Sequence, residues 1–118
     1  MARVLRPADP AEVASALARR AAGEATPADE RLLVKHFLAL LTQRAPGNSV
    51  EVRVPPYAAT QAIPGVRHTR GTPPAVVEMA ASTWLALALG EQSWAEAEAA
   101  AAVLASGERA DLSDLLPL

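Results

Sequence analysis

The sequence predicts an α+β fold in which helices cover one sheet. Two helix-start signals within the first 47 residues each precede residues suited to a helix. From residue 50 the apolar period changes from 3.6 to 2, which is typical of a half-buried strand. The predicted order is two helices, three strands, two helices, one strand and a tail, and such an order builds a sheet with helices layered on it.

The first two elements are expected to be helices over 10–22 and 27–45. The sequence DPAE at 9–12 offers an Asp cap, a proline in the first turn and a glutamate three residues after the cap. The sequence TPAD at 26–29 repeats this signal. Gly23 and the Pro-Gly pair at 46–47 end the two helices.

The second helix carries one apolar stripe, which we expect to face the core. The stripe consists of Leu33, Phe37, Leu40 and Leu41. Lys35 and His36 fall beside it, so their predicted place is its flank rather than a site.

The next three elements are predicted strands over 50–54, 57–63 and 75–79. In VEVRV the three valines point one way while the glutamate and arginine point the other. Pro55 and Pro56 end this strand, because proline cannot donate a ladder hydrogen bond.

Two short helices, a strand and a tail complete the predicted order. Residues 82–85 open a helix that stops at Gly90, and SWAE at 93–96 fits a capping box for a helix to about 102. We expect a fourth strand over 102–106, then a short helix or an extended tail at 111–116.

Length and composition predict one domain over residues 1–118, with a helical pair at 1–47 and a sheet with helices at 48–118. The net charge of −2 and the scattered arginines argue against nucleic-acid binding. The chain has no cysteine for a disulfide or a thiolate site. Without a signal peptide or an apolar run of about 18 residues, we expect a soluble, cytoplasmic protein.

From residue 50 onward the sequence resembles the sterol carrier protein-like family, and within it the small bacterial (actinobacterial) single-domain branch. The resemblance covers roughly the last 70 residues. It rests on VEVRVPPYAATQAI, RHTRGTPPAVVE, STWLALALGEQSWAEA and VLASGERADLSDLLPL. The resemblance implies a mainly antiparallel curved sheet of four to five strands, helices on one face, and an apolar tunnel between them. It implies binding or carriage of a sterol, a fatty acyl molecule or a similar lipid.

The chain also departs from the lipid carriers of that family. It ends soon after its last predicted strand, so the C-terminal helix that helps close the tunnel is expected to be short or absent. It also lacks the Ser-Lys-Leu-type signal of peroxisomal relatives.

The stretch RHTRGTPPAVVE at 67–78 allows two interpretations. In one it is a rigid loop with solvated arginines, as surface charges usually are. In the other, Arg67, His68 and Arg70 gather at the rim of a pocket and bind an acidic group, a role that suits the planar arginine fork.

The predicted function is non-catalytic binding of an apolar small molecule with an acidic group. His68 and Arg70 are expected to lie at the rim of the pocket. The predicted walls are Val52, Ile63, Val77, Met79, Trp84, Leu87 and Leu104. Trp84 and Trp94 have a second interpretation as packing anchors. The rival functions are an interaction domain whose cavity is filled by its own side chains, and a subunit that completes an enzyme's active site with Arg70. The exposed edge of a sheet would also allow a homodimer.

Catalytic residues, metal ligands and a cofactor are not expected. His36 and His68 lack the spacing of a metal site, and no serine stands in a nucleophile-elbow sequence. A phosphate-binding glycine loop is also missing from the sequence.

Overall fold

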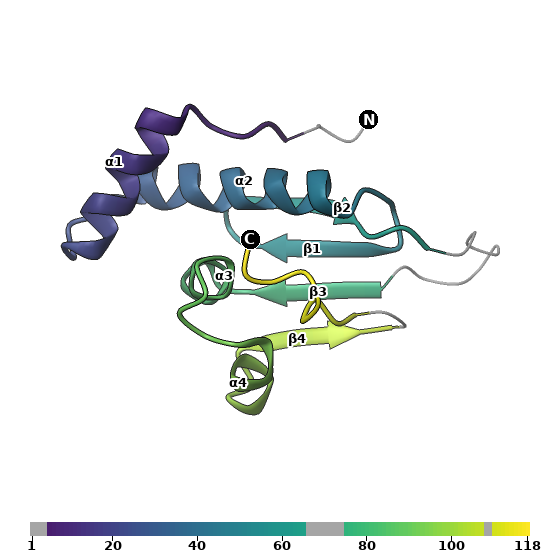
Figure 1. Cartoon of the computed structure of the whole chain (residues 1–118). Helices are drawn as coiled ribbons and strands as arrows, with labels where there is room; N and C mark the ends of the chain where they lie inside the picture. Colours follow the sequence, from purple (N-terminus) through teal and green to yellow (C-terminus); the bar gives the residue numbers. More distant parts are fainter. Residues whose placement is uncertain (1–4, 66–74, 108–109) are drawn as a thin grey trace.

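The structure, a computed structural model, describes residues 5–65, 75–107 and 110–118. Within them, four helices and four strands follow the predicted order (Figure 1). The helices are α1 (Pro10–Ala21), α2 (Pro27–Arg44), α3 (Ala81–Ala88) and α4 (Trp94–Ala99). The strands are β1 (Val50–Val54), β2 (Ala58–Ala62), β3 (Ala75–Met79) and β4 (Val103–Ser106). The tail contains a turn at 113–115 in place of a terminal helix.

Both N-terminal helices begin at the predicted caps. The Asp9 carboxylate accepts hydrogen bonds from the first-turn amides of α1. Thr26 and Asp29 form a reciprocal capping box at the start of α2. Asp29 is buried and also accepts two hydrogen bonds from Arg19, at 2.8 and 2.7 Å. The Arg19 guanidinium, together with the Thr26 amide, holds the pKa of Asp29 well below its usual range. This cap therefore also fixes α1 against α2.

The sheet is mixed, with strand order β2-β1-β3-β4. β1 pairs antiparallel with β2, and β3 pairs antiparallel with β4. The central pair, β1 with β3, is parallel. The predicted α+β class and the mainly antiparallel sheet are confirmed, with a parallel pair at the centre.

One face of the sheet forms the floor of the core. Val50, Val52 and Val54 of β1 are buried there, while Glu51 and Arg53 point to the other face and pair with each other. Alternate residues of β3 are buried in the same way. The period of 2 in VEVRV therefore correctly predicts which face of β1 is buried.

Helices α2 and α3 complete this core above the sheet. Leu33, Phe37 and Leu41 of the predicted α2 stripe are buried, and Leu40 is half-buried. Trp84 of α3 has no exposed surface, and its indole N–H donates to the Val34 carbonyl of α2 at 3.3 Å. No helix in the described ranges is long and apolar enough to cross a membrane.

Candidate functional site

Five of the seven predicted pocket walls are buried in the layer between the sheet and the helices. They are Val52, Val77, Met79, Trp84 and Leu87. None of the five lines any of the four main pockets on the described part of the chain. Their side chains pack against one another within one continuous core. Within the described residues these five predicted tunnel walls are therefore packed core side chains.

Ile63 and Leu104 lie elsewhere. Ile63 is half-buried and lines a surface pocket of about 520 Å³ beside Arg44 and Leu115. Leu104 was predicted to be a wall of the sheet–helix cavity, and the structure corrects this. It is 67% exposed, because it pairs with Glu78 on the outer face of the sheet while Val103 takes the inward position.

The predicted rim residues Arg67, His68 and Arg70 lie outside the described residues. Their part in binding an acidic group stays a prediction.

The structure instead presents a groove that the sequence interpretation missed. Two pockets, of about 590 and 410 Å³, share Lys35 and Tyr57. We call the joined pocket the N-terminal groove. Its lining residues are Leu5, Arg6, Ala8, Pro27, Ala28, Arg31, Leu32, Lys35, His36, Glu51, Tyr57, Ala58, Ala59, Thr60 and Gln61. They come from the N-terminal segment, α2, β1, the β1–β2 turn and β2, and Figure 1 shows the N-terminal segment running along α2.

Two hydrogen bonds between distant parts of the chain hold the walls of this groove. The backbone N–H of Ala8 donates to Nδ1 of His36 at 3.0 Å, which fixes the N-terminal segment to α2. The Tyr57 hydroxyl donates to the Glu30 carboxylate at 2.8 Å, which fixes the β1–β2 turn to α2. This bond to Glu30 raises the pKa of Tyr57. Each bond thus joins two segments that are far apart in the sequence, 28 residues for the Ala8–His36 bond and 27 residues for the Tyr57–Glu30 bond.

The groove combines apolar walls with cations. Leu5, Ala8 and Leu32 are half-buried and pack against the core from the groove side. Arg31 and Lys35 line it from the same face of α2, since residues four apart are neighbours on a helix. Neither cation forms an ion pair within the described residues, whereas Arg19, Arg20 and Arg53 do. Chemically, the groove suits a ligand with an apolar body.

The histidine at the groove predicts a pH-dependent stability. Burial lowers the pKa of His36, and Nδ1 accepts the Ala8 hydrogen bond only when it carries no proton. In the unfolded chain a histidine has a pKa of about 6.5, and in the folded protein the pKa of His36 is lower. The neutral His36 therefore stabilises the fold fully above about pH 6.5, and this stabilisation is lost as pH falls through the folded pKa. We expect the free energy of unfolding to fall more between pH 7.5 and pH 5 in wild type than in His36→Gln.

The measurement is urea unfolding at both pH values. His68→Gln, which removes the other histidine of the chain, is measured in parallel. Identical pH dependence in wild type and His36→Gln would contradict the expectation.

Lys35 and His36 were predicted to lie on the flank of the α2 stripe, and the structure places both on the groove wall. A like-charged pair at residues 31 and 35 was the one signal in the sequence for this site. In the described residues, no group of three His, Cys, Asp or Glu side chains could hold a metal ion.

Comparison with known proteins agrees with the fold. A family model described as bacterial SCP ortholog matches residues 27–118, which is more than three-quarters of the chain. The match starts at the first residue of α2, so it extends further than the predicted resemblance. No curated protein matches the chain. The chain belongs to the sterol carrier protein-like family, as one of its bacterial SCP orthologs.

Proposed function

We propose that this protein binds an apolar small molecule of the lipid class in the N-terminal groove and does not convert it chemically. Membership of the sterol carrier protein-like family supports lipid binding at the level of the family. The single observation that carries the proposal is the groove itself. Its two joined pockets, of about 590 and 410 Å³, fall in the usual size range of small-molecule sites, roughly 300–1,000 Å³.

The shape of the groove favours an elongated ligand. Leu32 and Ala28 of α2 lie on one pocket, and Ala58 of β2 and Leu5 lie on the other. A chain that passes Tyr57 would contact both sets of side chains. Each methylene buried there contributes up to about 0.8 kcal/mol, or roughly fourfold in affinity.

The test is binding of primary alcohols of increasing length, from octanol to dodecanol, measured by calorimetry. We expect affinity to rise with chain length. Ala28→Trp should weaken decanol binding at least about tenfold, because it fills the groove with a side chain from an exposed helix position. Ala18→Trp, at an exposed position of α1 outside the groove, is the matched control and should bind as wild type does. Equal binding by the two variants would refute the location.

The finer parts of the proposal are carriage of a lipid and recognition of an acidic group. Arg70 and His68 were predicted for the acidic group from the sequence. Titration of acidic amphiphiles against Arg70→Ala tests whether Arg70 binds the acidic group.

A second candidate function is an interaction domain whose apolar layer is filled by its own side chains. The complete burial of Val52, Val77 and Trp84 favours it. Native mass spectrometry after mild purification separates the two candidates. A co-purified small molecule supports the binding function, and a partner chain without one supports the interaction domain.

A further inference from the structure

We infer that the N-terminal groove selects acidic amphiphiles, and that Arg31 and Lys35 bind the acidic head group. The inference rests on the proposed function, and it adds the chemical class of the ligand and the residues that recognise it. The head group would be a carboxylate or a phosphate attached to an apolar body.

Arg31 and Lys35 place two positive charges on the same pocket. They are four residues apart on α2 and line the same pocket of about 590 Å³. Like charges at this spacing repel each other and destabilise a helix slightly. Within the described residues neither one has an ion-pair partner. An anion bound between them would remove this repulsion.

The carboxylates around the groove are already engaged with other groups. Glu51 lines the groove and pairs with Arg53. The three acidic residues adjacent in sequence to lining residues are Asp9, Asp29 and Glu30. They accept hydrogen bonds from the α1 amides, from Arg19 and from the Tyr57 hydroxyl, respectively. Asp9 and Glu30 keep their negative charge, because their donors are neutral, but within the described residues none of these carboxylates forms an ion pair with Arg31 or Lys35.

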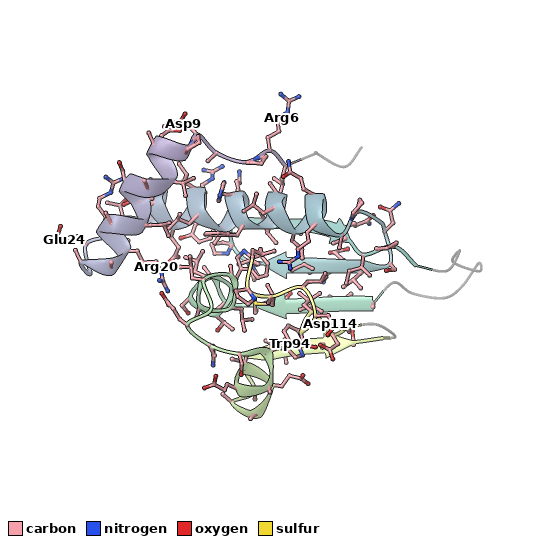
Figure 2. The ribbon with its side chains drawn as sticks, in the orientation of Figure 1. Arg6, Asp9, Arg20, Glu24, Trp94 and Asp114 are labelled. Atoms are coloured by element: carbon pink, nitrogen blue, oxygen red, sulfur yellow. The ribbon has the colours of Figure 1, made fainter. Side chains whose placement is uncertain are left out.

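The other basic groups of the groove contribute less. His36 is neutral in this structure, because its Nδ1 accepts the Ala8 N–H. Arg6 lines the pocket, but Figure 2 shows its side chain extending from the N-terminal segment away from α2. The two cations that α2 presents to a bound head group are Arg31 and Lys35, and Arg6 is a further cation on the same pocket.

The neighbouring apolar surface distinguishes an amphiphile from a free anion. Leu32 follows Arg31 directly in sequence and lines the same pocket, together with Ala8, Pro27 and Ala28. A head group at the cations would leave its apolar body against these side chains. Arg6 and Ala8 precede the family match at 27–118, so part of this recognition surface lies outside the matched residues.

The experiment titrates decanoate, decyl phosphate and decanol, each below its micelle concentration, and acetate and inorganic phosphate as free anions. The variants are Arg31→Gln, Lys35→Gln and Arg70→Ala, with Arg44→Gln as the matched control on the same helix as the first two, outside the groove. Each groove variant should weaken at least one acidic amphiphile about 10-fold to 100-fold, the scale of one charge-assisted hydrogen bond. Decanol binding should change less than about twofold, and Arg44→Gln should bind every ligand as wild type does.

The outcomes separate this inference from the proposed function. If wild type binds decanol but Arg31→Gln and Lys35→Gln bind the acidic amphiphiles normally, the inference is wrong and the proposed function stands. If Arg70→Ala alone weakens them, the head group lies at residues 67–70 and the inference is also wrong. If no ligand binds wild type, both fail. Acetate or inorganic phosphate binding as tightly as the amphiphiles would overturn the amphiphile class.

Salt dependence gives a second measurement that needs no variant. Affinity for the acidic amphiphiles should fall as sodium chloride rises from 20 to about 500 mM, because salt screens exposed charges. Affinity for decanol should not fall. Equal salt responses would also overturn the inference.

Discussion

Replacing Trp84 with alanine is expected to lower the free energy of unfolding by about 3–5 kcal/mol, the usual scale for truncating a large buried aromatic side chain. Trp84 has no exposed surface and is the largest of the fully buried side chains. Its removal would open a cavity between α2 and α3 and delete the hydrogen bond to the Val34 carbonyl. Denaturant unfolding measures the loss.

Leu104→Ala is the matched control, because Leu104 was predicted to be a wall of the same pocket and is exposed instead. This variant should lie within about 0.5 kcal/mol of wild type. A loss below about 1 kcal/mol in Trp84→Ala, together with weaker ligand binding, would show that Trp84 lines an open tunnel. The filled layer would then be the wrong description of the core.

Replacing Gly47 with alanine is expected to lower the free energy of unfolding by about 2–5 kcal/mol. Gly47 has a φ of 150°, and a Cβ there would lie 2.2 Å from the Ile63 carbonyl oxygen. That oxygen also accepts hydrogen bonds from the Ser49 amide and hydroxyl, so it cannot move away freely. Backbone strain of about 1–2 kcal/mol and overpacking of about 1–3 kcal/mol combine here.

Gly23→Ala separates these two causes. Gly23 has a φ of 74°, and nothing lies within 4 Å of the position of its Cβ. Gly23→Ala should therefore show the backbone strain alone, a loss of about 1–2 kcal/mol. Thermal or urea unfolding of both variants tests the difference. Equal losses would mean that the close approach of the α2–β1 loop to Ile63 does not constrain the fold.

The two apolar regions of the molecule have different consequences for function. The sheet–helix layer holds the residues that a lipid tunnel would use, and in this structure they pack against one another. The N-terminal groove is open, and its cations Arg31 and Lys35 form no ion pair within the described residues. If Ala28→Trp weakens ligand binding and Trp84→Ala does not, the binding function belongs to the groove.

Local signals in the sequence were sufficient to predict the elements. The capping boxes at Thr26 and Ser93 each connect residues three apart, so residues adjacent in the chain decide where these helices begin. The alternation in VEVRV likewise predicts which side chains of β1 are buried. The short strand β4 shows the limit of this signal. Val103 and Leu104 are both apolar, so the pattern does not say which one faces inward, and a shift of one residue exchanges the two faces.

The sequence by itself determined the α+β class, the order and approximate ends of the elements, the family and the buried faces of α2 and β1. Only the tertiary structure decided that five of the seven predicted pocket walls pack together in the core and that an open groove lies beside α2. Both results depend on contacts between distant segments, such as Ala8 with His36 and Tyr57 with Glu30. The packing of whole helices and strands determines which groups become hydrogen-bond partners. The residues next to a group in the chain do not determine which distant residue it will contact.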